Sequence, residues 1–335
     1  MIRIAINGFG RIGRQTAKFL INHKKIQLVA INDLAPVATL AHLFKYDSVH
    51  GIAQTEIKID GETLIIHKNK IKVFREKDPS KLPWKALKID IVIESTGKFR
   101  TAKLANQHLV AGAKKVIISA VPEDETKIII MGINDHLLKK SDQIISNASC
   151  TTNSAAPLID VIDKLCGIVS GYITTVHSYT SDQTLHDQPH NDLRRARAAA
   201  LSIIPTSTGA AKGVTKVFPQ FKNQMGGCGI RVPVPNGSLT DITYIVKKNV
   251  TMLQINEAFK NAANGYLKNI LQYTDEPIVS VDVIGNKFST VFDSQLTSVI
   301  GKMVKVVGWY DNESGYSARL VDLVEKWGAM VNQRN

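Results

Sequence analysis

Cysteine is scarce in this sequence of 335 residues, which holds only Cys150, Cys166 and Cys228. The three are scattered and form no Cys-x-x-Cys pair, so the sequence excludes a disulfide framework and shows no zinc-site spacing. This usage favours a reducing compartment. The first residues also lack a basic head followed by an apolar core and a cleavage site, and no apolar run approaches the ~18 residues that span a bilayer. We therefore expect a cytoplasmic protein with no membrane partner.

The composition excludes a disordered or fibrous class. Hydrophobic residues make up 44% of the chain and charged residues 21%, with a mean hydropathy of −0.04, as in ordinary globular proteins. At roughly 150 residues per domain, the length predicts about two domains. Basic residues outnumber acidic ones by 42 to 29, so the net charge of +13 attracts anions such as phosphorylated metabolites, nucleotides and nucleic acids.

Two patterns of apolar residues divide the chain. Up to about residue 150, apolar runs alternate with helix-compatible stretches, which is typical of a parallel sheet; the runs lie at 2–6, 28–31, 89–93 and 116–118. Later, longer alternating segments predict a mixed or antiparallel sheet, with strands at 171–180, 238–247, 278–284 and 303–310. Residues 316–331 predict an amphipathic helix. The predicted fold class is therefore α/β, with a doubly wound parallel sheet followed by an α+β domain.

A glycine-rich turn follows the first predicted strand. Gly8, Gly10 and Gly13 fit the pattern G-x-G-x-x-G, between a strand and a helical stretch. Such glycines let backbone N–H groups approach a pyrophosphate, which the helix N-terminus attracts. Asp33 follows the second predicted strand, where a carboxylate bonds the ribose hydroxyls of adenosine and repels the 2′-phosphate of NADP. We interpret these residues as an NAD site, with an ordinary tight turn as the alternative.

One cysteine occupies a position that favours reactivity. Cys150 lies just before an apolar helical pattern whose expected end is Gly167, and so falls in the first turn of a helix. The helix dipole and a nearby imidazolium would lower the pKa of its thiol. His177, on the predicted strand 171–180, is the candidate base. A buried cysteine with a structural histidine is the alternative.

Two further features are open to a structural interpretation. Residues 180–200 lack periodicity and carry several histidines and arginines, which predicts a long polar loop that is either functional or a solvated surface. Cys166, near the predicted helix end, and Cys228, among glycines, are interpreted as packing residues. No metal-ligand spacing occurs.

Six segments in the same order resemble those of phosphorylating glyceraldehyde-3-phosphate dehydrogenases. They are INGFGRIGR, ASCTTN, TTVHSYT, STGAAK, RVPVPN and WYDNESGYS, and they span nearly the whole chain. The resemblance implies that Cys150 attacks the aldehyde of D-glyceraldehyde 3-phosphate while His177 accepts the proton. It further implies that NAD takes the hydride and that inorganic phosphate releases the thioester as 1,3-bisphosphoglycerate, a reaction of glycolysis and gluconeogenesis.

The same resemblance assigns domains and binding roles. It implies a Rossmann NAD-binding domain over 1–149, onto which a C-terminal helix 313–335 packs, and a catalytic domain over 150–312. Further cofactor-binding positions are Arg11, Ile12, Lys77, Ser119 and Asn312, of which Asn312 would bind the nicotinamide carboxamide. Phosphate-binding positions are Ser149, Thr151, Thr180, Arg195, Thr208, Gly209 and Arg231.

The resemblance also implies a homotetramer, in which the loop 180–200 packs near a neighbouring subunit's cofactor site. This sequence departs from the family pattern at Val121, Gln188 and Ser314. A packing change is expected at Ser314, where the family usually carries tryptophan. Gln188 bears on the choice between NAD and NADP, and Val121 interrupts the usual Ser-Ala-Pro segment beside the cofactor.

Three other hypotheses are open at this stage. A sibling dehydrogenase would oxidise erythrose 4-phosphate and finish with water, but Thr208 and Gly209 match the phosphate-using branch. A nucleic-acid-binding protein would use the positive charge, yet no basic run with interleaved aromatic residues occurs, so nucleic acid is not expected as a primary partner. A thiol hydrolase would share the Cys–His pair but leave the glycine motif without a role.

Overall fold

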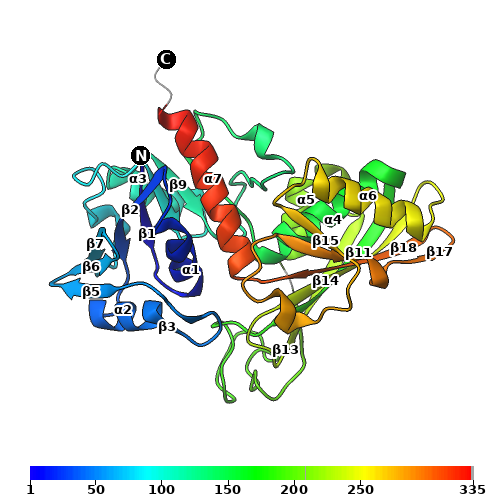
Figure 1. Ribbon diagram of the computed structural model, residues 1–335, viewed down its shortest axis with the longest axis horizontal. Helices are drawn as coiled ribbons and strands as arrows, with labels where there is room; N and C mark the ends of the chain where they lie inside the picture. The colour runs from blue at the N-terminus through cyan, green and yellow to red at the C-terminus, as the bar shows by residue number, and fades with distance from the viewer. Residues whose placement is uncertain (208, 333–335) are drawn as a thin grey trace. The chain divides into compact units, whose positions relative to one another are not determined.

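The computed structural model describes residues 1–207 and 209–332 of the chain (Figure 1). The chain divides into two compact units. The first unit holds Met1–Ala148 and the segment from Ser317 onward, and the second unit holds Ser149–Tyr316. Each unit contains its own eight-stranded sheet.

The sheet of the first unit is largely parallel, with the order β10-β9-β8-β1-β2-β7-β6-β5. All pairs from β10 to β7 are parallel, and β6 and β5 add antiparallel pairs at one edge. β8 and β9 are buried along their whole length, as expected of parallel strands covered on both faces. The bounds are β1 (Ile2–Asn7), β2 (Ile26–Asn32), β5 (Ile57–Asp60), β6 (Thr63–Ile66), β7 (Asn69–Phe74), β8 (Ile91–Glu94), β9 (Lys115–Ile118) and β10 (Ile144–Ser146).

Helices complete the first unit. They are α1 (Arg11–Leu20), α2 (Val37–Lys45), α3 (Ala102–Val110) and most of the C-terminal helix α7 (Ser314–Asn332), with a short hairpin of β3 (Tyr46–Asp47) and β4 (Gly51–Ile52) and two 3-10 turns, η1 (Pro79–Lys81) and η2 (Asp135–Leu137). α7 packs closely on the unit. Its fully buried Trp327 donates the indole N–H to the carbonyl of Lys139 at 3.2 Å, and a Cβ on Gly328 would lie 2.4 Å from the side chain of Ile2.

The sheet of the second unit is mixed, with the order β12-β13-β11-β14-β18-β16-β15 and with β17 paired to β18. β11 (Ile168–Ser178) runs parallel to β13 (Met225–Val232) and antiparallel to β14 (Ser238–Val246). The remaining strands are β12 (Ile204–Thr206), β15 (Leu271–Thr274), β16 (Thr290–Asp293), β17 (Ser298–Ile300) and β18 (Met303–Tyr310). Burial alternates along β14, so this sheet covers a core on one face.

Three helices contribute to that core, and they lie on the same side of the sheet in Figure 1. They are α4 (Cys150–Cys166), α5 (Ala210–Val217) and α6 (Met252–Asn264), with three 3-10 turns, η3 (Pro219–Phe221), η4 (Ser280–Val283) and η5 (Ser294–Leu296). α4 packs against β14, β16 and β18. None of the helices over residues 1–207 and 209–332 has the length and apolarity to cross a membrane.

The predicted fold class is confirmed, with one error in the elements. The sequence predicts a strand at 278–284, but the structure forms the turn η4 there. The Asp282 carboxylate accepts a hydrogen bond from the Val279 N–H at 2.7 Å, and Gly285 follows with a φ of +84°. An acidic side chain that caps its own backbone closes a turn in place of a strand, even where apolar residues alternate.

Candidate functional site

Cys150 is the first residue of helix α4. Ser149 caps the helix, because its backbone is extended (φ −107°, ψ 166°) and its Oγ accepts a hydrogen bond from the Thr152 N–H at 3.1 Å. The helix stops at Gly167, whose φ of 68° lies in the left-handed region. The partly exposed thiol of Cys150 therefore lies in the first turn, where the helix dipole favours negative charge on sulfur.

The imidazole of His177 lies against the Cys150 thiol. Its Nε2 is 3.4 Å from Sγ, which is hydrogen-bonding distance for sulfur. Its Nδ1 is 2.7 Å from the carbonyl oxygen of Ser178, which only accepts, and it also lies beside the Nη1 of Arg231, which only donates, so the two contacts favour opposite tautomers of the neutral ring. The ring is 5% exposed and packs edge-on against Tyr310, with 6.0 Å between ring centroids. The structure thus brings the candidate nucleophile and the candidate base together.

Arg231 stands opposite His177, because β13 and β11 are parallel neighbours with these two residues in register. Its Nη1 donates to the carbonyl oxygen of Ser178 at 2.8 Å and lies 2.5 Å from the histidine Nδ1. The sequence places Arg231 only among the phosphate-binding positions. Its contact with the candidate base depends on strand register over 54 residues of chain.

Burial and the charge of Arg231 favour a neutral pair. Burial raises the pKa of the Cys150 thiol, and the guanidinium opposes this shift. Burial, together with the same guanidinium, lowers the pKa of His177 to about 3. These shifts run against the expectation that an imidazolium lowers the pKa of the thiol. A cation next to the ring disfavours a second positive charge on it.

A buried hydroxyl cluster that the sequence analysis missed lies next to the pair. The hydroxyl of Tyr310 is 2.9 Å from Thr151 Oγ1 and 3.1 Å from Thr175 Oγ1. Burial raises the pKa of Tyr310, so the phenol keeps its proton. Thr151, a predicted phosphate-binding residue, is 4% exposed and directs its hydroxyl into this cluster. The alternation along 303–310 could have identified Tyr310 as facing inward.

The side-chain amide of Asn312 has a defined orientation. Its Oδ1 accepts hydrogen bonds from Ser178 Oγ at 2.9 Å and from Ser238 Oγ at 3.0 Å. Ser238 Oγ in turn accepts the Ser178 N–H at 3.2 Å. With Oδ1 engaged twice, the amide group of this buried residue is left to donate to a ligand. The sequence analysis identified Asn312 but neither serine.

Arg195, a predicted phosphate-binding residue, is held by neighbouring polar groups. Its Nε donates to Thr206 Oγ1 at 2.8 Å and its Nη2 donates to the Ser207 carbonyl oxygen at 3.1 Å. It also forms an ion pair with Asp182. Its charge lowers the pKa of His177 as well, although less than burial and Arg231 do, so it acts on the same site.

The remaining predicted phosphate-binding residues lie in loops and at helix starts. Thr180 follows β11, and its N–H donates to Gln183 Oε1 at 3.3 Å. Gly209 is the residue that precedes α5. Thr208 lies outside the described residues. Ser149 caps α4, as described above.

The glycine turn of the first unit leaves no space for a side chain at Gly8 or Gly13, whereas a Cβ on Gly10 would meet no atom within 4 Å. Gly8 has a φ of +91°, and a Cβ on Gly13 would lie 2.2 Å from the Gly8 carbonyl oxygen. Helix α1 follows Gly10, and its described surroundings provide neither a capping side chain nor an acidic first-turn residue. Asp33 directs its Oδ2 toward the Phe9 N–H at 2.7 Å. This close-packed turn, helix start and carboxylate fit the pyrophosphate and ribose of NAD.

The other predicted cofactor-binding residues differ in their surroundings. Arg11 and Ile12 form the first turn of α1, and the Arg11 guanidinium pairs with Asp47 at 2.9 Å. Their backbone N–H groups are therefore the atoms suited to a pyrophosphate. Lys77 is exposed, and Ser119 directly follows β9.

Residues outside the site are explained by packing. Cys166 is buried and donates its thiol to the Ile162 carbonyl at 3.3 Å, which fits the predicted packing role. Cys228 is partly exposed on β13, 3.8 Å from Thr174 Oγ1. Ser314, one of the positions at which this sequence departs from the family pattern, is fully buried. Its N–H donates to Asp311 Oδ1 at 2.9 Å, so it forms the turn that begins α7.

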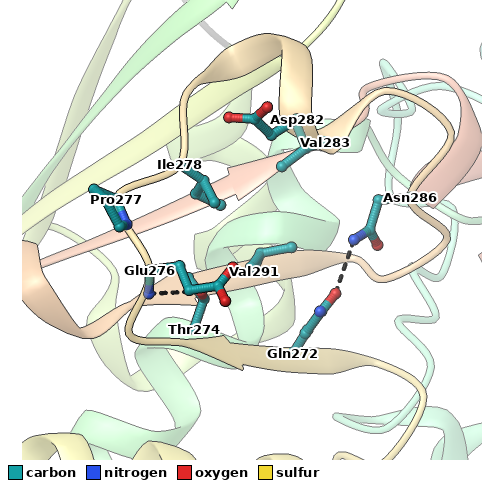
Figure 2. Close-up of a pocket in the computed structure, with 9 residues that line it drawn as sticks. All are labelled: Gln272, Thr274, Glu276, Pro277, Ile278, Asp282, Val283, Asn286 and Val291. Atoms are coloured by element: carbon teal, nitrogen blue, oxygen red, sulfur yellow. Dashed lines mark hydrogen bonds between the residues drawn. The ribbon is translucent and has the colours of Figure 1, made fainter.

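A cavity of about 670 Å³ opens in the second unit beside β15, β16 and η4 (Figure 2). Amides, carboxylates and apolar side chains line it, and Asn286 donates to Gln272 across it at 2.8 Å. None of its lining residues is a predicted site residue. Over residues 1–207 and 209–332, no three His, Cys, Asp or Glu side chains are grouped in a way that could hold a metal ion.

Comparisons with known proteins connect the two units to described families. A profile described as "Glyceraldehyde 3-phosphate dehydrogenase, NAD binding domain" matches residues 2–102, and one described as "Glyceraldehyde 3-phosphate dehydrogenase, C-terminal domain" matches residues 149–312. The chain is 55% identical over 328 residues to glyceraldehyde-3-phosphate dehydrogenase of Thermotoga maritima, covering 97% of this chain and 98% of that protein. It is 52% identical over 324 residues to the Geobacillus stearothermophilus protein of the same name, covering 96% and 97%.

Proposed function

Because the chain belongs to the glyceraldehyde-3-phosphate dehydrogenase family, with NAD as its cofactor, we propose that it oxidises D-glyceraldehyde 3-phosphate to 1,3-bisphosphoglycerate through a thioester on Cys150. Inorganic phosphate is the second substrate, and the reaction serves glycolysis and gluconeogenesis. The observation that carries this proposal is the 3.4 Å separation between Cys150 Sγ and His177 Nε2 at the start of a helix. A thiol, a base and helix N–H groups together suit nucleophilic attack on a carbonyl.

His177 takes the thiol proton as sulfur attacks the aldehyde carbon. Both groups are neutral in the ligand-free protein, so proton transfer to Nε2 accompanies formation of the C–S bond. The Ser178 carbonyl accepts the Nδ1–H and stabilises the imidazolium that results. The negative charge that develops on the former aldehyde oxygen lies near the first-turn N–H groups of α4. The same imidazolium can return its proton to that oxygen.

Each unit contains residues to which we assign a role in cofactor binding. When bound, NAD supplies the hydride acceptor. In the first unit, the backbone of Gly8, Gly10, Arg11, Ile12 and Gly13 binds the pyrophosphate, Asp33 binds the adenosine ribose, and Lys77 and Ser119 line the site. In the second unit, Asn312 donates its amide N–H to the nicotinamide carboxamide, because its Oδ1 is already engaged by two serines. An amide held in one orientation would fix which face of a bound nicotinamide ring is presented to the substrate.

Two guanidinium groups favour anion binding at the catalytic site. The charge of Arg195 lowers the pKa of Arg231, although burial is the larger cause, so the two cations repel each other. A phosphate relieves that repulsion and accepts hydrogen bonds from both. Ser149, Thr180, Thr208 and Gly209 supply hydroxyl and backbone donors to the two phosphate sites, and Thr151, whose hydroxyl contacts Tyr310, supplies its backbone N–H. Phosphate can then attack the thioester carbon and release Cys150.

Rates of NADH formation test this proposal. We expect turnover of D-glyceraldehyde 3-phosphate that depends on inorganic phosphate, with NAD preferred over NADP. The same assay with erythrose 4-phosphate is the comparison. A preference for the four-carbon sugar without any need for phosphate would replace the proposal with the sibling activity.

We also propose a cytoplasmic homotetramer. Leu193, Leu201 and Ile203 are 81%, 83% and 70% exposed around the loop 180–200. Large apolar side chains grouped on a surface favour association with another protein surface. Sedimentation equilibrium tests this: a tetramer mass is expected, and replacing Leu193 and Leu201 by Ser should shift the protein to smaller species. A monomer at all concentrations would contradict the assembly but not the activity.

A further inference from the structure

Four buried polar residues form a hydrogen-bonded network in the first unit, apart from the catalytic pair. Asn7, Asn32, Glu94 and His108 are all 4% exposed or less. The first three end the neighbouring parallel strands β1, β2 and β8, and His108 lies on α3. The network therefore joins the carboxyl ends of the strands, which is the edge where parallel sheets bind ligands.

The carboxylate of Glu94 is the centre of the network. Its Oε2 accepts from Asn7 Nδ2 at 2.5 Å and contacts His108 Nε2 at 3.0 Å. Its Oε1 accepts from the Thr96 N–H at 2.8 Å and from the Thr96 hydroxyl at 2.5 Å. Asn7 Nδ2 and His108 Nε2 lie 3.4 Å apart because they share one acceptor. Four donors around one buried carboxylate offset the loss of its hydration.

Trp84 sets the direction of the hydrogen bonds at one end. Its indole Nε1 is 3.0 Å from His108 Nδ1, and an indole N–H only donates. Nδ1 is therefore the acceptor, which places the imidazole proton on Nε2, where Glu94 receives it. The network thus requires the neutral Nε2–H tautomer of His108.

At the other end of the network, the main chain of Glu76 fixes the orientation of the Asn32 amide and so directs the hydrogen bonds toward Glu94. Asn32 Oδ1 accepts the Glu76 N–H at 2.8 Å, and Asn32 Nδ2 donates to the Glu76 carbonyl at 2.9 Å. A backbone donor and acceptor at fixed positions leave this amide one orientation. Asn32 Nδ2 then donates to Asn7 Oδ1 at 2.7 Å, which turns Asn7 Nδ2 toward Glu94. Both ends therefore impose one consistent direction on every bond.

The loops that follow these residues are those assigned to the cofactor. Gly8 and Asp33 directly follow the network residues Asn7 and Asn32. Lys77 directly follows Glu76, whose main chain bonds Asn32. The loops are also tied to one another: the Gly8 N–H donates to the Asn32 carbonyl at 2.8 Å, and Asp33 Oδ2 accepts from the Phe9 N–H at 2.7 Å. A change in the network is therefore transmitted to the glycine turn and to the ribose-binding carboxylate through single peptide units.

We propose that Asn7, Asn32, Glu94 and His108 are positioning residues for NAD, holding the glycine turn and Asp33 in their binding geometry before the cofactor arrives. The proposal rests on the cofactor roles assigned above to Gly8 and Asp33. Preorganised loops lower the ordering cost of binding, so the network acts on cofactor affinity and not on the chemical step.

Glu94→Gln is the direct test. It keeps the shape of the side chain but places an amide NH₂ group, which only donates, next to groups that donate to the carboxylate of Glu94. We expect the Kd of the cofactor-free variant for NAD, measured by calorimetry, to rise about tenfold, the effect of one buried hydrogen bond turned unfavourable. The kcat at saturating NAD should stay within about twofold, since the catalytic pair is untouched. Asp60→Asn, at an exposed acidic residue of the same unit, is the matched control and should leave the Kd unchanged.

Trp84→Phe distinguishes positioning from simple loss of stability. Alone, it frees the tautomer of His108 and should raise the Kd about threefold, because one hydrogen bond is lost. Combined with Glu94→Gln, it lets the imidazole move its proton to Nδ1 and accept from the new amide, so the double variant should bind NAD more tightly than Glu94→Gln. If both substitutions only damaged the structure, their effects on the Kd for NAD would instead be additive in the double variant. An additive loss, or an unchanged Kd in folded Glu94→Gln, would overturn the proposal.

A spectroscopic measurement on the unaltered protein covers the case in which Glu94→Gln does not fold. In ¹⁵N-histidine spectra, the ring assigned to His108 is expected to be neutral and protonated at Nε2, and its signals should change in Trp84→Phe. A His108 ring protonated at Nδ1 would overturn the network as described. If the unaltered protein binds no NAD, the proposed function fails, whereas normal NAD binding with an insensitive Glu94→Gln variant refutes the positioning role alone.

Discussion

Arg231 and His177 face each other on neighbouring parallel strands, with Nη1 of the arginine 2.5 Å from Nδ1 of the histidine. A permanent cation at this distance disfavours proton uptake by the ring. Burial, together with Arg231, lowers the pKa of His177 to about 3, so the ring carries no positive charge throughout the neutral range. The guanidinium also opposes the rise in the pKa of Cys150 that burial causes. Arg231 therefore acts on both members of the pair.

Removing this charge should change thiol reactivity even without substrate. In Arg231→Gln, we expect the pKa of His177 to rise and the thiol to lose a stabilising charge, so that alkylation of Cys150 by iodoacetamide slows at neutral pH by about tenfold or less. Alkylation rates from pH 5 to 9, followed by mass spectrometry, measure the effect. Arg194→Gln removes an exposed charge from the loop 180–200 of the same unit and should leave the profile unchanged. Identical profiles for Arg231→Gln and the unaltered protein would contradict this role.

The lowered pKa of His177 also predicts an acid-sensitive fold. The unfolded chain binds a proton near pH 6.5, whereas the folded site resists it until about pH 3, so stability falls as the pH drops through that window. Between pH 7 and pH 5, this one group should cost about 2 kcal/mol of unfolding free energy. Urea unfolding of the unaltered protein and of His177→Gln at both pH values checks the prediction. Between pH 7 and pH 5, the unfolding free energy of His177→Gln should fall by about 2 kcal/mol less than that of the unaltered protein. Equal losses would count against a buried neutral imidazole at His177.

Cys150→Ser should separate chemistry from cofactor binding. A hydroxyl beside a neutral imidazole is a much weaker nucleophile than a thiol, so turnover should fall by at least about 10³-fold. The glycine turn and Asp33 are unchanged, so the Kd for NAD measured by calorimetry should stay within about twofold. Cys228→Ser is the matched control, because Cys228 is also partly exposed but lies away from the helix start, and it should retain full activity. Appreciable turnover in Cys150→Ser would refute the nucleophile assignment.

The glycine turn and the helix that begins at Cys150 could be predicted from the sequence because both depend on residues adjacent in the chain. Gly8 and Gly13 are required where a Cβ would overlap backbone atoms, and this requirement is visible as spacing. Ser149 marks the helix start and Gly167 its end by ordinary capping preferences. The fold class followed from the change in apolar periodicity after about residue 150.

Contacts between distant strands could not be predicted in the same way. The pairing of His177 with Arg231 depends on the register of β11 and β13, which apolar patterning leaves open. The bonds from Asn312 to Ser178 and Ser238, and the buried Glu94–His108 contact, likewise join segments whose proximity only the fold establishes. Each of these residue types is common in loops and at strand ends, so none gives a signal by itself.

The orientation of the Asn312 amide should matter for the hydride step. Ser178→Ala with Ser238→Ala removes both donors to Oδ1, so the amide can rotate and present its oxygen to the carboxamide. At about 1 kcal/mol for each hydrogen bond, kcat should fall roughly tenfold or more, with each single variant closer to fivefold. Steady-state rates at saturating NAD measure this. Ser298→Ala, at an exposed serine on β17, is the control, and unchanged kcat in the double variant would contradict the orienting role.

Asp33 should decide between NAD and NADP. Its carboxylate accepts the Phe9 N–H of the glycine turn at 2.7 Å and the Ala35 N–H at 3.0 Å, and we propose that from this position it bonds a ribose 2′-hydroxyl and repels a 2′-phosphate. In Asp33→Ser, the loss of a charged hydrogen bond should lower kcat/KM for NAD by about 10- to 100-fold. The value for NADP should rise, because the repulsion is gone. Initial rates with both cofactors at saturating phosphate measure the ratio, with Asp60→Ser as the control at an exposed acid of the same unit. An unchanged ratio would mean that other residues, such as those around Gln188, set the preference.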